Sequence, residues 1–556
     1  MDTAQTTLVK GKRDLGLSLD GSISAATGPA CNHCIDLNIL RNQVGYWRAM
    51  HRQSKVREEQ LRHQIEELEA KVRLRERQLF GRKSERDAKC KPDVGTPDNK
   101  DKDEKRKRGQ QPGTCGHGRR LHENLPAKSV DCPLPQSDCE CEHCGLPYEE
   151  LPWTEDSQEV VVEVKAHRRV IKRRCYQPTC RCPGNRRIII APGPAKLIPK
   201  GTLHLLSWVT LLLDKYLYQR PTYRFLQELN QTLNLDIAQG TVTGGLKRLS
   251  PLFEPLYEML IARNVSESLW HADETRWLVF EEVEGKQGYK WYLWVFRSES
   301  TVVYVLDPSR AAEVPEGHFG KEAAGILVVD RYSAYKAMVL VKNGQLLLAF
   351  CWAHVRRDFL GVAKDWPKHH EDWGLLWVDK IAELYRLNAQ RLLVLDEPDA
   401  FGEADAALRE AVSKMAEERS AELSNEDLHQ ARRKVLQSME QHWSGLTLFV
   451  DDPTVPMDNN EAERRLRNPI IGRKNYRGSG AQWSGKLAIM LFSLFQTLLL
   501  WDINPRLWLI DYLTCCAQNG CRPPETTADF LPWNLSEDQL ERYRNPTTRI
   551  EENNTS

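Results

Sequence analysis

The fold is decided by residues 269–330, which open with Leu269-Trp270-His271-Ala272-Asp273-Glu274-Thr275 and close with Gly325-Ile326-Leu327-Val328-Val329-Asp330. The first run predicts an extended strand with an acid in its middle. The second predicts a short buried strand that ends in a carboxylate. Runs rich in aromatic and β-branched residues predict two strands between them, at 290–296 and 301–306, and a fifth follows at 345–351. The polar segment 309–324 is compatible with a helix.

Three strands, a helix, and then alternating strand and helix is the layout of a ribonuclease-H-like core. In such a layout Asp273 and Asp330 fit as ligands of divalent cations. Two Mg²⁺ ions about 4 Å apart can activate a nucleophile on a phosphodiester and stabilise the leaving oxygen. Glu274 is not expected to share their site, because neighbouring residues in a strand face opposite sides. With 77 acids in 556 residues, an acid beside a strand is also common without function.

Length and composition set broad limits. The length predicts three or four domains, and the net charge of +1 means that any nucleic-acid contact must come from local basic patches. The most apolar run, Leu487 to Leu500, is interrupted by Ser493, Gln496 and Thr497 and predicts a buried helix rather than a membrane span. The amino terminus lacks a signal-peptide pattern, so we expect a cytoplasmic protein with no membrane partner and with its 15 cysteines reduced or bound to metal.

The amino-terminal region predicts a helix for partner binding. Residues 1–38 have a disordered composition, 39–88 predict a coiled coil, and 89–113 are a charged linker. The helix is expected from Leu40 to about Arg86. Its seam follows alternating steps of four and three residues, with Arg75 as the one break, and consists of Leu61, Ile65, Leu68, Val72 and Leu79. This pattern predicts homo-oligomerisation, although a helix packing within its own chain would give the same pattern.

Cysteine pairs in residues 114–191 predict a zinc-ribbon-like domain with one structural Zn²⁺. Cys141 and Cys144 form a C-x2-C knuckle, and Cys175 with either Cys180 or Cys182 would complete four thiolates. Cys139 and Cys132 are possible substitutes. The runs 159–164 and 168–171 between the pairs are strand-like. Nine Lys or Arg and no acid lie between Val164 and Ile190, which suits contact with a DNA backbone.

Helical patterns surround the predicted core. Residues 192–262 predict a helical DNA-binding domain, in which 225–229, a turn near 233–236 and 239–249 could form a helix-turn-helix. Residues 263–358 hold the first part of the core and end in Cys351-Trp352-Ala353-His354-Val355-Arg356-Arg357, where Cys351 and His354 are expected to support the site. Residues 359–450 predict a helical insertion, with helices at 382–391, 405–418 and 427–442.

Residues 451–512 predict the second part of the core, and 513–556 a carboxyl-terminal tail. A third acid is expected from residues 457–467, where Asp458, Glu461 and Glu463 are the candidates. Asp458 or Asn459 would cap the helix. Basic residues follow, interleaved with Gly and Tyr, and are expected to bind DNA phosphates: Arg464, Arg467, Arg473, Lys474 and Arg477. A solvated helix end is the alternative.

These motifs together resemble a DDE transposase of the insertion sequence sixty-six family. The resemblance is carried by 79–86, the cysteine knuckle, 271–275, 330–335, 351–357, 458–475 and Leu531-Pro532-Trp533-Asn534, and it spans roughly residues 60–535. It implies that Asp273, Asp330 and Glu463 are the catalytic triad, because Glu463 directly precedes Arg464 as the family glutamate does. The second cysteine pair departs from the tighter family spacing, and Arg331 stands where the family often has glycine.

The resemblance implies metal-dependent cleavage at the ends of an insertion sequence and transfer of the freed 3′-hydroxyl to target DNA. The expected cofactors are two Mg²⁺ or Mn²⁺ ions per site. The expected partners are double-stranded DNA, as inverted repeats and target, and accessory proteins of the same element, in a bacterial nucleoid-associated setting. Two alternatives are a catalytically inactive, sequence-specific DNA-binding regulator and a ribonuclease-H-like nuclease that only cleaves.

Overall fold

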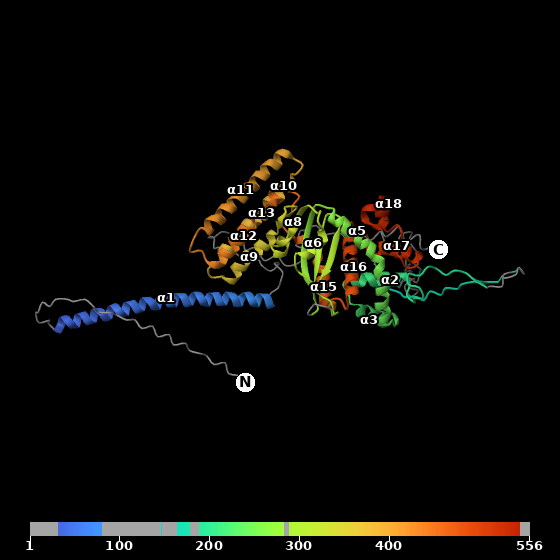
Figure 1. Ribbon diagram of the computed structural model, residues 1–556, viewed down its shortest axis with the longest axis horizontal. Coiled ribbons are helices and arrows are strands. Elements are labelled where there is room, and N and C mark those ends of the chain that lie inside the picture. Colours follow the sequence, from blue (N-terminus) through green and yellow to red (C-terminus); the bar gives the residue numbers. More distant parts are fainter. Residues whose placement is uncertain are drawn as a thin grey trace, which may run out of the picture. The chain divides into compact units, whose positions relative to one another are not determined.

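The structure, a computed structural model, describes residues 32–80, 146, 164–177, 179, 188–282 and 288–544 (Figure 1). The chain divides into two compact units, Met1–Lys91 and Pro92–Ser556. The smaller unit contains one helix. The larger unit contains the sheet and the other described helices.

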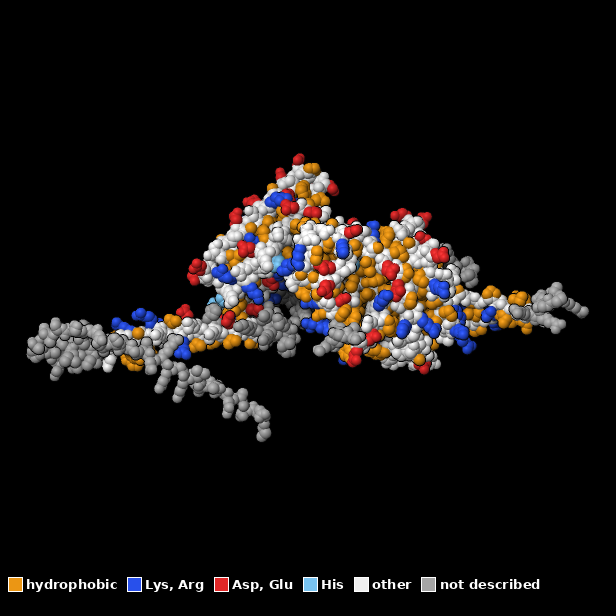
Figure 2. Space-filling view, in the orientation of Figure 1, with side chains coloured by type: hydrophobic (Ala, Val, Ile, Leu, Met, Phe, Trp, Pro, Cys, Tyr) orange, Lys and Arg blue, Asp and Glu red, His pale blue; other side chains and the backbone are white. Residues whose placement is uncertain are grey.

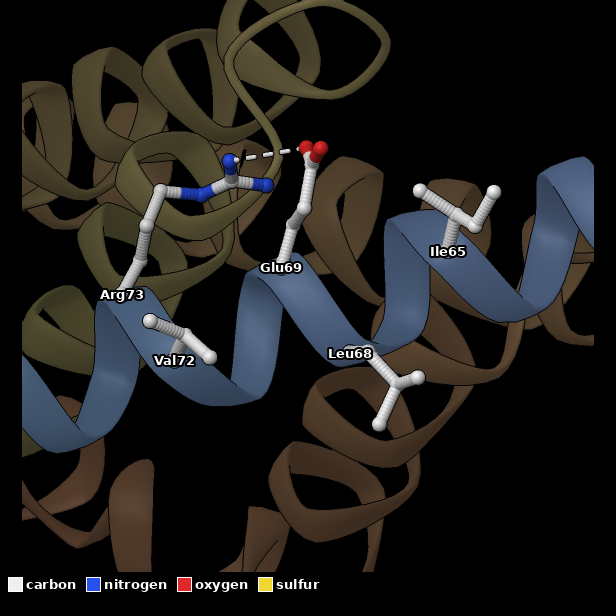
Figure 3. Close-up of a pocket in the computed structure, with 5 residues that line it drawn as sticks. All are labelled: Ile65, Leu68, Glu69, Val72 and Arg73. Carbon is white, nitrogen blue, oxygen red and sulfur yellow. Dashed lines mark hydrogen bonds and ion pairs between the residues drawn. The ribbon is translucent and has the colours of Figure 1, made fainter.

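The helix of the smaller unit, α1, runs from Asn32 to Phe80 and is 49 residues long. Its bounds confirm the predicted helix, which begins eight residues earlier than expected. Leu61, Ile65, Leu68 and Val72 of the predicted seam are about half exposed along it. Figure 3 shows a hollow on α1 that is lined by three of these residues and by the ion pair between Glu69 and Arg73, whose charged atoms are 3.3 Å apart. The seam is therefore an apolar stripe on the surface of its own unit.

A five-stranded mixed sheet forms the centre of the larger unit, as all five predicted strands are present. Its strand order is β5-β4-β3-β6-β7, in which β3, β4 and β5 are antiparallel and β6 and β7 run parallel to β3. The strands are β3 Leu269–Leu278, β4 Lys290–Arg297, β5 Val302–Asp307, β6 Gly325–Val329 and β7 Leu346–Phe350. The fold is thus multidomain α/β, as predicted.

The register between the two central strands sets the candidate site. β3 pairs with β6 so that His271 lies opposite Val328. Continuing this register by two residues places Asp273 beside the residue that follows β6, Asp330. Neighbouring strands are about 4.8 Å apart. The two acids that are 57 positions apart in sequence are therefore neighbours at the carboxyl end of the parallel pair.

Three helices pack against the antiparallel part of the sheet. α15 packs on β3 and β4, while α16 and α5 pack on β5 (Figure 1). Their buried faces belong to one hydrophobic core that also includes Trp277, Tyr304 and Phe492. The bounds are α5 Glu254–Val265, α15 Asn460–Tyr476 and α16 Gln482–Leu500. Shorter helices follow β5 and β6: α6 Glu313–Phe319, α7 Ser333–Ala337 and α8 Val339–Lys342.

α16 confirms the prediction of a buried apolar helix. By length and composition it could cross a membrane, but 72% of the relevant window is buried inside the fold. Its polar residues have a structural task, because β5 is an edge strand whose N–H groups need acceptors. The N–H of Tyr304 donates to Ser493 Oγ at 2.9 Å, and the N–H of Val302 donates to Thr497 Oγ1 at 3.0 Å. The interruptions of the apolar run thus close one edge of the sheet.

The segment between β7 and α15 is helical, which confirms the three helices predicted there. The buried guanidinium of Arg391 joins its two long helices to the segment's end, since it donates to Asp405 at 2.8 Å and to the carbonyl of Val450 at 2.9 Å. The helices are α9 Trp352–Asp365, α10 Glu371–Leu393, α11 Pro398–Leu423, α12 Gln430–Gln441, α13 Trp443–Leu446 and α14 Leu448–Asp451.

The helical segment before the sheet contains the predicted helix pair. The turn between its two helices contains Asn234, which has a left-handed backbone with φ of 50°. Lys247 and Arg248 are exposed on the second helix. The first helix of the segment, α2, packs against α17. The bounds are α2 Leu205–Tyr216, α3 Thr222–Leu233, α4 Gln239–Leu249, α17 Pro505–Gln518 and α18 Glu537–Arg544, with short 3₁₀ turns at Ser250–Phe253, Thr527–Phe530 and Pro532–Asn534.

An exposed arm precedes these helices and consists of residues 164–177 and 188–196. It contains two short antiparallel strands, β1 Cys175–Tyr176 and β2 Ile189–Ile190. The predicted strand at 168–171 is wrong: these residues are exposed, and the backbone pairing begins only at Cys175. Residues 159–163, the rest of the other predicted strand, lie outside the described residues.

Candidate active site

Asp273 lies in the middle of β3 and Asp330 directly follows β6, and each has one carboxylate oxygen fixed by the backbone. Asp273 Oδ1 accepts a hydrogen bond from the N–H of Glu274 at 2.8 Å. Asp330 Oδ1 accepts one from the N–H of Tyr332 at 2.9 Å, as is common where aspartate begins a turn. Local backbone geometry thus orients both side chains.

Glu463 joins the two aspartates from the first turns of α15. Burial, and then the negative charges of Glu274, Asp330 and Glu463, raise the pKa of Asp273 well above its ordinary value. A raised pKa of this origin indicates several carboxylates in a partly desolvated space. The structure therefore places Asp330 and Glu463, the other two acids predicted for the triad, within electrostatic range of Asp273.

The contacts of the three acids in residues 458–463 distinguish their roles. Asp458 Oδ1 accepts from the N–H of Asn460 at 3.0 Å and caps the helix. Glu461 forms ion pairs with Arg464, at 2.8 Å, and with Arg297 of β4, at 3.9 Å. Of these three acids, Glu463 is the one whose negative charge contributes to the raised pKa of Asp273, after burial. Glu463 is thus distinguished from Asp458 and Glu461 by its electrostatic effect on Asp273.

A buried hydrogen-bond network positions α15 over β3. The side chain of Asn459, 1% exposed, donates to the carbonyl of Ala272 at 2.7 Å and contacts His271 Nδ1 at 3.1 Å. Its own N–H donates to Cys351 Sγ at 3.2 Å. Burial lowers the pKa of His271 to about 4, so this ring is neutral near pH 7. His271 and Asp273 share one face of β3, so the network lies beside the carboxylates.

The predicted supporting residues both lie at this network. Cys351 is fully buried, and burial raises the pKa of its thiol to about 11, so it remains a protonated thiol. His354 Nε2 lies 3.7 Å from Glu463 Oε1. Burial and then the nearby Arg357 cation lower the pKa of His354. Neither His271 nor Arg357 was predicted from the sequence to have a role in the site. The two-residue spacing of His271 from Asp273 was the available signal for His271.

Glu274 is held on other partners. Its side chain is 2% exposed and accepts hydrogen bonds from Arg310 Nε at 2.9 Å and from the Tyr335 hydroxyl at 2.8 Å. The Arg310 guanidinium lies 4.0 Å from the centroid of the Tyr332 ring. Because Glu274 is neutralised and enclosed, it stabilises the turn after β6.

The donor set fits a hard divalent cation in its chemistry. Carboxylate oxygens are the ligands that Mg²⁺ prefers, and a cation would relieve the repulsion that raises the pKa of Asp273. The site is not assembled for binding, however, since no group of three acidic, His or Cys side chains within the described residues is placed to hold a metal. The carboxylate of Glu463 is engaged by Arg357, at 2.8 Å and 3.2 Å from its two oxygens.

The residues predicted to bind DNA differ in their surroundings. Arg473 is half-buried and donates to Thr275 Oγ1 at 3.1 Å and to the carbonyl of Arg276, so it fastens α15 to β3. The following turn also packs on β3, where a Cβ on Gly478 would lie 2.2 Å from the carbonyl oxygen of Leu278. The exposed members of the predicted set are Arg464, Arg467, Lys474 and Arg477.

Basic and apolar side chains are exposed together on the arm that precedes the helical segment (Figure 2). Of the predicted zinc ligands, the structure describes Cys175, whose side chain is exposed at the start of β1. Cys141, Cys144 and Cys180 lie outside the described residues, as do Cys132, Cys139 and Cys182. The zinc site therefore stays a prediction.

Comparison with known proteins places the chain in a family. Residues 202–487, about half of the chain, match the family model described as Transposase IS66 family. The chain belongs to the IS66 transposase family. The matched residues include α2 to α4, all five strands of the sheet and the three clustered acids.

Relatives of uncharacterized function cover most of the chain. One uncharacterized protein of Sinorhizobium fredii (strain NBRC 101917 / NGR234), y4jD, is 26% identical over 512 residues, 87% of this chain and 97% of that protein. A second, y4qI of the same strain, is 26% identical over 466 residues, 79% of this chain and 80% of that protein. The similarity thus extends beyond the matched family segment. Membership of the IS66 family suggests a nucleic-acid-processing transposase.

Proposed function

We propose that this IS66 family protein is a metal-dependent DNA transposase that cleaves a strand at the ends of its element and joins the freed 3′-hydroxyl to target DNA. The clustering of Asp273, Asp330 and Glu463 carries this proposal. Asp273 lies on β3, Asp330 directly follows the neighbouring strand β6, and Glu463 lies on α15; burial, and then the negative charges of Glu274, Asp330 and Glu463, raise the pKa of Asp273.

The sheet supports the same interpretation. Three antiparallel strands are followed by two strands parallel to the first, in the order β5-β4-β3-β6-β7, and this order supports our proposal of a ribonuclease-H-like core. In such a core the acids would hold two divalent cations. When bound, these would activate the attacking oxygen and stabilise the leaving one.

The reaction balances without an external energy source. In the first step the oxygen of water forms a bond to phosphorus, and the bond between phosphorus and the 3′-oxygen breaks, leaving a 3′-hydroxyl and a 5′-phosphate. In the second step that 3′-hydroxyl attacks a phosphodiester of target DNA, where one P–O bond forms as another breaks. Asp273, Asp330 and Glu463 would orient the reacting phosphate through the ions that they hold.

Exposed basic residues would align the DNA. Arg464 and Arg467 lie one turn apart on α15, the helix that carries Glu463, and Lys474 and Arg477 lie at its far end. Because phosphate contacts fix the position of a duplex, these residues would direct a strand past the acids. Lys247 and Arg248 of α4 and the basic arm offer further contacts. The surface stripe of α1 would join two copies of the chain.

A strand-transfer assay tests the proposal. The full-length protein is incubated with a labelled duplex carrying the terminal inverted repeat of its element, a plasmid target, and Mg²⁺ or Mn²⁺. We expect joined products that require the cation and disappear in Asp273→Asn and Asp330→Asn. Glu383→Gln, on an exposed carboxylate of α10 paired with Arg386, is the matched control and should join like the parent. Joining by Asp330→Asn at the parent's rate would refute the proposal.

A DNA-binding regulator without catalysis is the second candidate. It is favoured by the ion pair between Arg357 and Glu463, because a carboxylate neutralised in this way is not free to hold a metal. This candidate predicts specific binding to the inverted repeat without nicking in any divalent cation. A protein that only cleaves would instead give nicked ends and no joined product, so the same gel separates the three outcomes.

A further inference from the structure

Glu463 forms an ion pair with Arg357, which distinguishes it from Asp273 and Asp330. Both of its oxygens accept from the same nitrogen of Arg357, at 2.8 Å and 3.2 Å, and His354 lies on the same side. Within the described part of the site, the cations pair with Glu463 and with Glu274. They do not pair with Asp273 or Asp330, whose fixed oxygens accept from backbone N–H groups.

The helix that carries Arg357 is rigidly anchored. α9 buries Trp352, Val355 and Phe359, and Phe359 stacks on Trp377 of α10 with ring centroids 5.1 Å apart. The guanidinium itself is different, since the Arg357 side chain is 39% exposed while Glu463 is 25% exposed. Rotation of the long arginine side chain can therefore change the distance between its guanidinium and Glu463 without any movement of the buried face of α9.

We propose that Arg357 is a positioning residue that holds the carboxylate of Glu463 while the site lacks metal and leaves it when a divalent cation binds. This inference rests on the proposed function. Glu463 cannot give the same oxygens to Arg357 and to a metal ion at full strength, and two cations on one carboxylate repel each other. The displaced guanidinium remains beside the site, where its planar fork matches the oxygens of a DNA phosphate.

The first test measures metal affinity without catalysis. Mn²⁺ is titrated calorimetrically into the full-length protein and into Arg357→Gln. We expect the dissociation constant to fall about fivefold in the variant, which corresponds to about 1 kcal/mol, the upper end for a partly exposed ion pair. Arg386→Gln removes an exposed arginine from α10 and serves as the control, with unchanged affinity. An unchanged or weaker affinity in Arg357→Gln would overturn the inference.

A double-mutant cycle separates a contact with Glu463 from a general change in charge. In a Glu463→Gln background, Arg357→Gln should no longer tighten Mn²⁺ binding, because the carboxylate that the arginine holds is gone. If the fivefold gain persists in that background, the arginine acts through its distant field and the inference is wrong. If Arg357→Gln does not fold, Arg357→Lys, which keeps the charge but loses the fork, should tighten binding about twofold, and no change would overturn it.

The proposed function has its own control in this experiment. The parent should bind Mn²⁺ and Asp273→Asn should not. If Asp273→Asn still binds Mn²⁺, the metal site lies elsewhere, and the proposed function fails independently of the role of Arg357. At saturating Mn²⁺, Arg357→Gln should also join strands about tenfold more slowly than the parent, because the phosphate contact is missing. Tighter metal binding with slower joining is a combination that a purely structural arginine would not give.

Discussion

Replacing Asn459 with alanine is expected to destabilise the larger unit and to remove strand transfer, although Asn459 is not one of the residues proposed to hold metal. The side chain is 1% exposed and makes two buried contacts, a donated bond to the carbonyl of Ala272 at 2.7 Å and a contact with His271 Nδ1 at 3.1 Å. Alanine leaves both partners unsatisfied, at about 1–3 kcal/mol each. We therefore expect a loss of about 2–6 kcal/mol in the free energy of unfolding.

Strand-transfer activity should fall by more than the loss of folded protein accounts for. Asn459 precedes the first turn of α15, and its carbonyl accepts a hydrogen bond from the N–H of Glu463, so a shift of Asn459 also shifts Glu463. Urea unfolding followed by circular dichroism measures the stability, and strand transfer is assayed well below the unfolding midpoint. Asn460→Ala is the matched control on the adjacent, half-buried position, with an expected change within about 0.5 kcal/mol. A loss below 1 kcal/mol in Asn459→Ala, with joining at the parent's rate, would show that this network does not position Glu463.

Three further outcomes follow from the structure. Burial and like charges raise the pKa of Asp273, so the folded chain binds a proton more tightly there than the unfolded chain. The free energy of unfolding therefore falls as the pH rises from the unfolded-state pKa toward the raised folded-state pKa. Asp273→Asn should raise the free energy of unfolding of the metal-free protein by about 0.5–2 kcal/mol at pH 8, and by less at pH 5. Ser493→Ala should cost about 1–3 kcal/mol in urea unfolding, because the N–H of Tyr304 at the sheet edge loses its acceptor. Leu68→Asp, in the exposed stripe of α1, should weaken self-association at least tenfold in sedimentation equilibrium; an unchanged association constant would exclude the stripe as the interface.

The sheet and two of the three acids could be predicted because their signals are local. Each strand is a short apolar or aromatic run, and Asp330 ends such a run abruptly. Asp273 and Asp330 are separated in sequence by the same number of residues as paired positions of β3 and β6. Once the two strands were predicted correctly, the two acids were therefore also expected to be neighbours. The helices of the insertion were predictable from their periodicity for the same reason.

The third acid could not be chosen from the residues alone. Asp458, Glu461 and Glu463 share one short polar segment, and what separates them is tertiary: Arg297, on a strand more than 150 residues earlier, pairs with Glu461. The contact of Arg357 with Glu463 spans 106 positions and had no local signal. The failed strand prediction at 168–171 has the opposite cause, since these residues have β-propensity but pair with no strand among the residues that the structure describes.

The helical insertion can be large without disturbing the site because its first residues and the residues that follow it are hydrogen-bonded to each other. At its start, the N–H of Trp352 donates to the carbonyl of Met457 at 2.9 Å, and the N–H of Asn459 donates to Cys351 Sγ at 3.2 Å. The indole of Trp352 also donates to the carbonyl of Leu446 at 2.7 Å. These bonds fix the first turn of α9 against the start of α15. Arg357 and Glu463 therefore meet across a junction whose geometry does not depend on the outer ends of α10 and α11, which explains how residues on either side of a long insertion can share one site.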